Sequence, residues 1–224
     1  MKTLLAWLLL LAVPAAGAQL PPSEAEAARF TGLHAAAWKG DVAQIRKLAV
    51  NSAVNATDAY GRTPLHLATF ARRREAIRAL VAAGADLGRL ENDRYDCVTI
   101  AAVADDEETL RILLELGASA KLVTSRYDGT ALIAAAHLGH DGVVRQLIAA
   151  GAPLDHVNNL HWTAVIEAIV LGDGGRRHQE TLRALIAAGA NLQLADRERR
   201  TPLQLARSRG YAAMAKMLQE AGAR

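Results

Sequence analysis

The sequence predicts an all-α solenoid of about six helix–turn–helix repeats with short β-turn fingers. A six-residue phrase recurs along the chain, beginning at Thr31, Thr63, Asp96, Thr130, Thr163 and Thr201. The starts lie 32, 33, 34, 33 and 38 residues apart, and a regular period near 33 is typical of a stacked repeat array. A Gly-Ala pair closes five apolar stretches, at Gly84, Gly117, Gly151, Gly189 and Gly222. Because no single repeat can bury its apolar face alone, the stack must be the folding unit.

The second copy of the phrase indicates that each repeat folds as a pair of helices. Thr63 can cap the first helix, and Pro64 suits its first turn, where no amide hydrogen is needed. The apolar pattern predicts a second helix over 75–83 with one apolar face. Gly84 follows directly and should end that helix, as glycine commonly does just past a helix end.

The phrase at 63–68, Thr-Pro-Leu-His-Leu-Ala, resembles the ankyrin repeat when it recurs at this period. The resemblance runs from about Phe30 to Arg224 and divides the chain into repeats at approximately 30–57, 58–90, 91–124, 125–157, 158–195 and 196–224. The third and fifth copies are degenerate, because Cys97 and Ala164 stand in place of the proline. The resemblance implies a concave face, lined by the fingers and the first helices, where family partners commonly dock.

The first eighteen residues have the features of a secretory signal peptide. Lys2 provides a positive start, residues 4–13 form an apolar run too short to span a bilayer, and 16–18 match an Ala-x-Ala cleavage site. We therefore expect cleavage after Ala18, export to the periplasm without membrane insertion, and a polar N-terminal arm over 19–29. An uncleaved anchor and a buried helix are the alternatives for this stretch.

Composition and charge argue against nucleic acid and a membrane surface as partners. The 224 residues carry 26 basic and 23 acidic side chains, a formal net charge of +3. Loss of Lys2 with the leader changes the count to 25 minus 23, or about +2, which is too small to favour either partner. The sequence contains neither a Gly-x-Ser-x-Gly nor a His-Glu-x-x-His motif. We therefore expect no enzyme activity, no cofactor and no metal.

The scarce aromatic residues gather at positions that the family resemblance places on the concave face. Eight aromatic side chains lie outside the leader, and six of them occupy these finger and first-helix positions. Tyrosine, tryptophan and arginine are the usual energetic centres of protein interfaces. The predicted partner-binding residues are Trp38, Tyr60, Arg62, Phe70, Tyr95, Tyr127, His137, Leu138, Trp162, Arg200 and Arg209. The alternative is that these side chains pack one repeat against the next.

Cys97 is the only cysteine, so the chain can form no internal disulfide. The simpler interpretation is a small packed residue, as unpaired cysteine usually is. The alternative is a redox-sensing thiol, whose pKa would be lowered at a helix N-terminus. Asp93 and Asp96 would oppose that effect because they are negatively charged.

Repeat five carries five extra residues within 171–179. We interpret them as a longer loop between its two helices, because flexible loops lengthen at little thermodynamic cost. The alternative is a contact with a specific partner. The family resemblance also implies that His34 and His66 bond the turn backbone between repeats and have no catalytic role.

The sequence therefore predicts a non-catalytic protein-interaction module in the periplasm. We expect it to be a monomer that binds one protein partner, an exported enzyme or a toxin, through its concave aromatic face. The alternative function, from another class, is a redox-linked protective or sensor protein that acts through Cys97.

Overall fold

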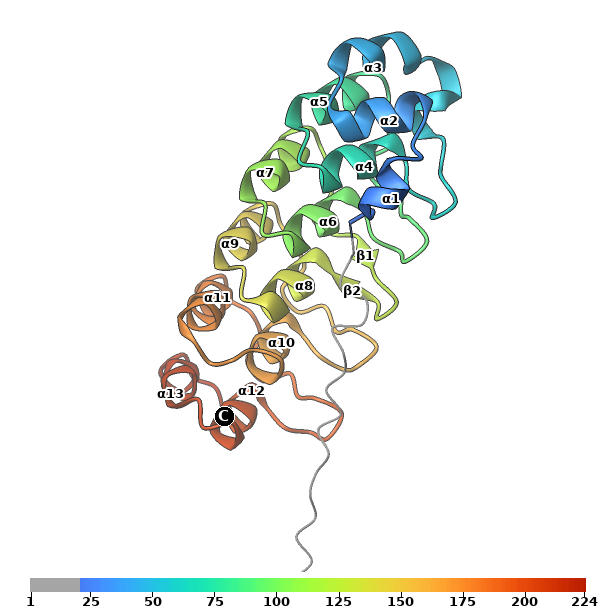
Figure 1. The fold of residues 1–224 in the computed structure, drawn as a ribbon. Coiled ribbons are helices and arrows are strands. Elements are labelled where there is room, and N and C mark those ends of the chain that lie inside the picture. The colour runs from blue at the N-terminus through green and yellow to red at the C-terminus, as the bar shows by residue number, and fades with distance from the viewer. Residues whose placement is uncertain (1–20) are drawn as a thin grey trace, which may run out of the picture.

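The computed structural model describes residues 21–224, except for the side chains of Asn51 and Ser52. The expected signal peptide and its cleavage site after Ala18 lie outside the described residues. Figure 1 shows a curved stack of helical pairs, which confirms the predicted all-α solenoid with ankyrin-like repeats.

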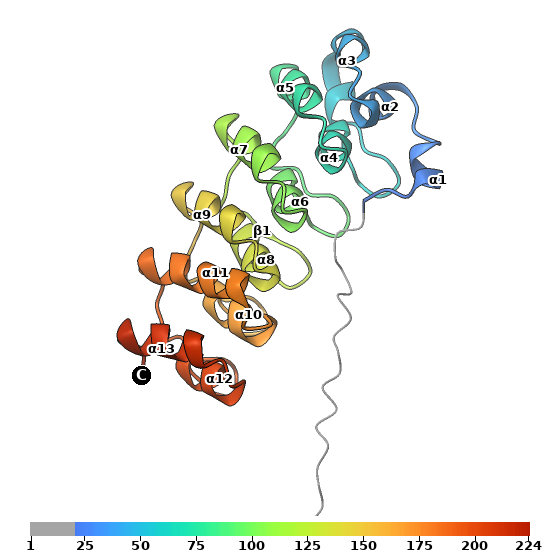
Figure 2. The ribbon, with the colours of Figure 1, turned by 60° about the vertical axis from the view of Figure 1, so that its left-hand side comes forward.

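Each pair consists of an inner helix, which follows a finger, and an outer helix, which leads to the next finger. The inner helices are α2 (Gly32–Lys39), α4 (Pro64–Phe70), α6 (Cys97–Val103), α8 (Ala131–Leu138), α10 (Ala164–Val170) and α12 (Pro202–Ser208). The outer helices are α3 (Val42–Leu48), α5 (Arg74–Ala82), α7 (Glu107–Glu115), α9 (Asp141–Ala149), α11 (Arg176–Ala187) and α13 (Ala212–Glu220). A 3-10 helix, η1 (Asn51–Asn55), follows α3. The inner helices form one column and the outer helices another (Figure 2).

The repeated threonine begins the inner helices as the sequence predicts. The Thr63 hydroxyl accepts a hydrogen bond from the His66 amide, and Pro64 occupies the first turn. Equivalent side-chain caps form at Asp96, Thr130, Thr163 and Thr201. Each such cap contributes about 1 kcal/mol to helix stability. At the other end of the pair, Gly84 has a φ of 91°, in the left-handed region where a glycine meets no steric cost.

The hydrophobic core is continuous from the first repeat to the last. Leu65 of an inner helix and Ile77 and Leu80 of its outer partner are fully buried, and the same pattern recurs in the following repeats. Each helix packs against its partner and against its counterpart in the adjacent repeat, so burial couples neighbours along the stack. Within residues 21–224, no helix combines the length and the apolar character needed to cross a bilayer.

The fingers are short turns closed by backbone hydrogen bonds. In the second repeat the Asp58 amide donates to the Arg62 carbonyl at 3.0 Å, and the third, fifth and sixth repeats repeat this bond. In the fourth repeat the finger is a small antiparallel hairpin of β1 (Val123–Thr124) and β2 (Gly129–Thr130), with Val123 opposite Thr130. Neighbouring fingers are joined as well, for example by the Asn92 amide donating to the Tyr60 carbonyl at 3.0 Å.

A short helix, α1 (Glu24–Ala27), precedes the first repeat, within the segment expected to be a polar arm. Ser23 and Glu26 form a reciprocal capping box at its start. Helix α1 lies on the finger side of the inner helices, away from the outer column (Figure 2). The arm is therefore partly helical and returns to the surface of the repeats.

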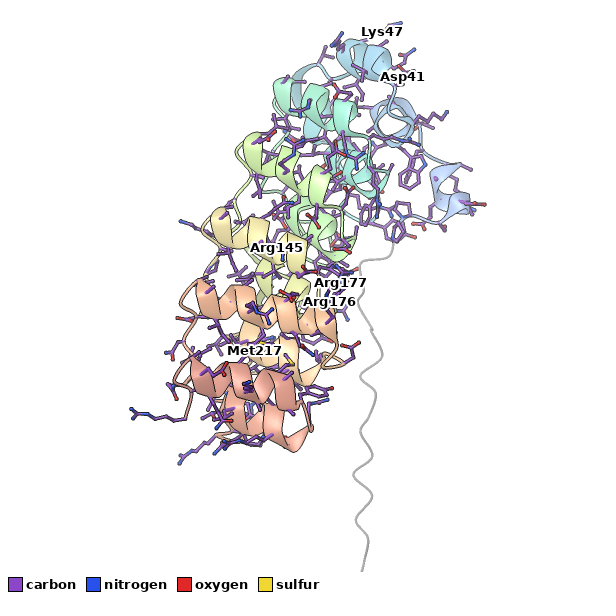
Figure 3. All side chains as sticks on the ribbon, turned by 90° about the vertical axis from the view of Figure 1, so that its left-hand side faces the viewer. Asp41, Lys47, Arg145, Arg176, Arg177 and Met217 are labelled. Atoms are coloured by element: carbon purple, nitrogen blue, oxygen red, sulfur yellow. The ribbon has the colours of Figure 1, made fainter. Side chains whose placement is uncertain are left out.

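The extra residues of repeat five lengthen the connection between its helices, as predicted, and also lengthen the outer helix: residues 171–175 separate α10 from α11, whereas residues 139–140 separate α8 from α9. Helix α11 has 12 residues, against 9 in α9, and Arg176 and Arg177 lie side by side at its start (Figure 3). The Arg177 guanidinium lies 2.8 Å from an Asp105 carboxylate oxygen and 3.4 Å from an Asp141 oxygen. The added turn therefore ties repeat five to repeats three and four.

Candidate binding surface

The inner surface, formed by the fingers and the inner helices, divides the predicted site residues into three groups. Tyr60, Leu138, Arg200 and Arg209 are exposed. Trp38, Phe70, Tyr127, His137 and Trp162 are half-buried, with part of each side chain open to solvent. Arg62 and Tyr95 are only 6% and 8% exposed, so neither offers the surface that a direct partner contact needs.

Arg62 is buried because it organises the second finger. Its Nε lies 2.8 Å from an Asp58 carboxylate oxygen, and its Nη2 lies 3.2 Å from Glu26 Oε1. The guanidinium also lies 4.4 Å from the centre of the Tyr60 ring and 5.6 Å from that of Phe30, both within cation–π range. While Glu26 lies against it, Arg62 is therefore too buried to contact a partner directly, and its place in a binding surface stays a prediction.

Three aromatic residues at the N-terminal end of the stack form a compact group with Arg62. We call this group, Phe30, Trp38, Tyr60 and Arg62, the N-terminal corner. Phe30 and Trp38 pack edge to face, with ring centroids 5.9 Å apart. Tyr60 remains 52% exposed although it lies under the Arg62 guanidinium. Packing between residues of the chain therefore holds for Phe30 and Trp38, while Tyr60 keeps an exposed face and its role in binding stays a prediction.

A second feature, the inner apolar pair, lies in the middle of the stack. Leu138 ends α8 and Leu171 follows α10, so the two leucines hold equivalent places in adjacent repeats. Each is 39% exposed, which is high for leucine in a well-packed repeat. Val170 and His137, both half-buried, precede them in the chain. Exposed apolar side chains gathered in one place generally mark an interaction site.

The last repeat adds positive charge to the same surface. Arg199 and Arg209 are exposed, and neither forms an ion pair within the described part of the chain. Arg200 differs, because it lies 2.7 Å from an Asp196 carboxylate oxygen and 3.1 Å from Glu198. The C-terminal end of the inner surface therefore presents unpaired arginines beside the finger of repeat six.

Glu167 is a buried acid beneath His137. It lies on α10, one turn into the helix, where repeats two and six carry Leu67 and Leu205. The Asn158 amide donates to Glu167 Oε1 at 2.9 Å, while Oε2 accepts no hydrogen bond and lies 3.7 Å from His137 Nδ1. Burial raises the pKa of Glu167 to about 7, because the charged form loses its hydration. Burial also lowers the pKa of His137.

Cys97 packs inside the core at the start of α6 and is only 1% exposed. Burial raises the pKa of its thiol well above the usual range, with Asp96 adding to the effect. A redox-sensing thiol requires the opposite: a lowered pKa and access to an oxidant. The redox function is therefore not supported, and the simpler interpretation of a small packed residue fits the structure.

The histidines that resemble the family motif join repeats. His66 Nδ1 accepts from the Thr63 amide at 3.0 Å, and its Nε2 donates to the Arg89 carbonyl at 3.1 Å. Burial lowers the pKa of His66 to about 4, which keeps the ring neutral in this role. His34 Nε2 donates to the Arg62 carbonyl at 3.2 Å in the same way. Across residues 21–224, no three histidine, cysteine, aspartate or glutamate side chains gather as a metal site would require.

The sequence interpretation missed three features of this surface. The Ser23-x-x-Glu26 capping signature was present and could have placed a helix before the first repeat. Leu171 lies eight residues after the repeated threonine, as Leu138 does, so the same rule could have placed it on the predicted site. The unpaired state of Glu167 Oε2 had no sequence signal, because it depends on which groups from other repeats reach it.

Comparison with known proteins finds the same architecture. A family model described as "Ankyrin repeats (3 copies)" matches residues 5–91 and 98–175. The ankyrin repeat protein YahD of Escherichia coli (strain K12) is 35% identical over 190 residues, which cover 84% of this chain and 94% of the relative. The crystal structure of an ankyrin repeat domain from Acinetobacter baumannii has a TM-score of 0.80 at 44% identity, covering 86% of this chain and 98% of that one. The ankyrin repeat domain of Bcl-3, a member of the IkappaB family, has a TM-score of 0.77 at 25% identity, covering 88% of each chain.

Proposed function

The chain belongs to the ankyrin repeat family, and from that premise we propose that it is a non-catalytic module whose inner surface binds one protein partner outside the cytosol. Ankyrin repeats generally serve as protein-interaction modules, and a stacked array offers the extended concave surface that such binding uses. The partner we expect is an exported enzyme or a toxin, and the module itself acts as a monomer.

The observation that carries this proposal is the inner apolar pair. The equivalent position is exposed in most other repeats, where it carries Lys39, Ala104 or Arg209, yet repeats four and five place a leucine there with 39% of its surface exposed. Two leucines at equivalent positions give a contact that spans two repeats. Burying such side chains against a partner contributes about 1.5–3 kcal/mol each when burial is complete.

The arginines of repeat six support a partner with acidic groups beside its apolar contact. Arg199 and Arg209 are exposed and unpaired within residues 21–224, so they remain available to carboxylates of another protein. Charges at the edge of an interface act mainly on the rate and specificity of encounter. We therefore expect the leucines to set affinity and the arginines to set the salt dependence of association.

The test is affinity capture of the partner by the wild-type chain and by the double variant Leu138→Ser, Leu171→Ser. We expect the partner retained by the wild type to be lost by the double variant, while Val50→Ser retains it. Val50 is a matched control because it is an exposed apolar residue that lies beyond the outer helix α3. Equal recovery of the same partner on wild type and double variant contradicts the proposed surface.

Export is the part of the proposal that rests on the sequence features of residues 1–18. The expected product is a chain that begins at Gln19 in the periplasmic fraction. N-terminal sequencing after cell fractionation checks this directly, and an intact N-terminus in the cytosolic fraction contradicts it.

A further inference from the structure

Trp38 and Arg62 of the N-terminal corner already contact the chain's own residues 22–30, which include the corner residue Phe30. Pro22 is buried, Glu26 pairs with Arg62 at 3.2 Å, and Phe30 packs on Trp38 with ring centroids 5.9 Å apart. Glu26 lies in α1 and Phe30 follows the turn that ends this helix, where the Phe30 amide donates to the Ala27 carbonyl at 3.3 Å, whereas Pro22 precedes the N-cap Ser23. The segment therefore rests on the inner surface like a short bound peptide.

The contacts that hold this segment are few. Helix α1 has four residues, far fewer than a helix needs to be stable alone in water. Ser23, Glu24, Ala25, Ala28 and Arg29, more than half of the segment, are exposed. Segments with few buried contacts open locally at a small fraction of the global unfolding free energy. The segment can therefore leave the corner without unfolding the repeats.

Arg62 determines which chemical groups could replace residues 22–30 once this segment has left. When Glu26 leaves, the buried guanidinium keeps only the Asp58 carboxylate, 2.8 Å from Nε, and its Nη2 loses the carboxylate oxygen 3.2 Å away. The open corner then exposes a guanidinium whose free N–H groups form strong charge-assisted hydrogen bonds with carboxylates, so it favours another carboxylate. Trp38 would lose the ring packed on its edge, and the open corner therefore favours an aromatic side chain as well.

We propose that Trp38, Tyr60 and Arg62 form a receptor for a short helical segment of the protein partner that carries a carboxylate four residues before an aromatic ring. Residues 22–30 cover this receptor until the partner segment displaces them. The inference rests on the proposed function, because it names the partner chemistry at the N-terminal end of the same inner surface. Tyr60, which is 52% exposed, provides the open edge at which exchange begins.

The first experiment measures release of the segment in the full chain. Trypsin cuts after Arg29, which is exposed but adjoins the packed Phe30, so cleavage depends on opening. Glu26→Gln keeps the capping box, since glutamine serves there too, and removes the charge that faces Arg62. Glu24→Gln is the matched control, because it neutralises an exposed acid of the same helix. We expect Glu26→Gln to be cut about tenfold faster than Glu24→Gln, in proportion to the open population.

The second experiment measures binding of a labelled synthetic peptide with the sequence of residues 21–30. When residues 22–30 are docked most of the time, only the open fraction of chains can bind a competing peptide. The apparent affinity is then the intrinsic affinity multiplied by that fraction. We expect the peptide to bind the full chain carrying Glu26→Gln and Phe30→Ala about tenfold or more tightly than it binds wild type. The same peptide with Glu26→Gln should bind that variant about tenfold more weakly. Fluorescence anisotropy gives both constants, and a thermal melt shows that the variant is folded.

Equal tryptic rates for the two single variants, or equal peptide affinity for wild type and the open variant, would overturn the inference. A wild-type dimer in sedimentation, with the segment exchanged between copies, would overturn it too. Partner capture that still depends on Leu138 and Leu171 would then leave the proposed function standing. Loss of that dependence overturns the proposed function, whatever the peptide does.

Discussion

The buried acid Glu167 makes folding stability depend on pH in a direction that can be worked out. Burial raises its pKa from 4.5 to about 7, so the unfolded chain releases this proton near pH 4.5 while the folded chain holds it to about pH 7. Between these values the folded state binds more protons, and stability therefore falls as pH rises. At 1.36 kcal/mol per pH unit, the loss is about 3 kcal/mol, complete above pH 7.

The substitution Glu167→Gln removes this loss. Glutamine does not ionise, and its carbonyl can accept the bond that Asn158 now donates at 2.9 Å. We expect the variant to differ little from wild type at pH 4.5 and to be about 3 kcal/mol more stable at pH 8. Urea unfolding followed by tryptophan fluorescence, at constant ionic strength across that range, gives the two stability curves.

The difference between the curves is the informative quantity, because His66 acts in the opposite sense. Burial lowers its pKa from 6.5 to about 4, so stability is lost as pH falls from 6.5 towards 4. The two effects overlap between pH 4.5 and 6.5 and flatten the wild-type curve. His137 lies 3.7 Å from Glu167 Oε2, and repeating the comparison in a His137→Gln background removes any contribution from that pair. A difference that stays constant from pH 4.5 to 8 would refute the reasoning.

Four further predictions concern the repeat backbone and its core. Arg94 and Arg199 hold finger-tip positions at φ of 66° and 62°, where repeat two has Gly61 at 74°, so Arg199→Gly and Arg94→Gly should each stabilise by up to about 1 kcal/mol. Gly61→Ala should destabilise by about 1–3 kcal/mol, because its Cβ would lie 2.4 Å from Asn92 Oδ1. Urea unfolding checks the glycine and the alanine substitutions alike, and midpoints equal to that of the wild type would contradict them. Asp96→Thr restores the capping residue of the other repeats and removes a buried carboxylate whose pKa is raised by burial. The variant should therefore be more stable than wild type by about 1 kcal/mol at pH 7 and by less at pH 4, which urea unfolding measures. Cys97 should react with a maleimide only in unfolded chains, and rapid labelling of native protein at pH 8 would disprove its burial.

The regular part of the fold was predictable because the same physical signals recur in each repeat. The threonine cap, the proline of the first turn and the left-handed glycine are local features, and Thr63, Pro64 and Gly84 all behave as their residue types require. The predicted second helix over 75–83 differs by one residue at each end from Arg74–Ala82. The ends of helices can therefore be predicted from sequence, because capping and turn formation depend on residues that are close together in the chain.

The departures arise where residues far apart in the chain meet. Arg62 was expected at the surface because its position faces the groove, but Glu26, 36 residues earlier, covers it. Arg177 ties the outer helix of repeat five to repeat three because Asp105, 72 residues earlier, is within reach. No period or motif encodes such pairings. They follow from the curvature of the stack, which brings side chains of non-adjacent repeats together.

The position of Glu167 connects stability with the proposed binding surface. Repeats two and six carry leucine at the equivalent positions, which shows that packing favours an apolar side chain there. Glutamate at this position lowers folding stability by about 3 kcal/mol at neutral pH. The cost falls in the repeat that carries Leu171, and directly beneath His137, which precedes Leu138. Natural sequences accept such local losses mainly at functional sites. A positive charge that a partner holds beside His137 would favour the ionised acid without touching the buried Oε2 and would recover part of the lost stability, so binding at this point should strengthen as pH rises through 7.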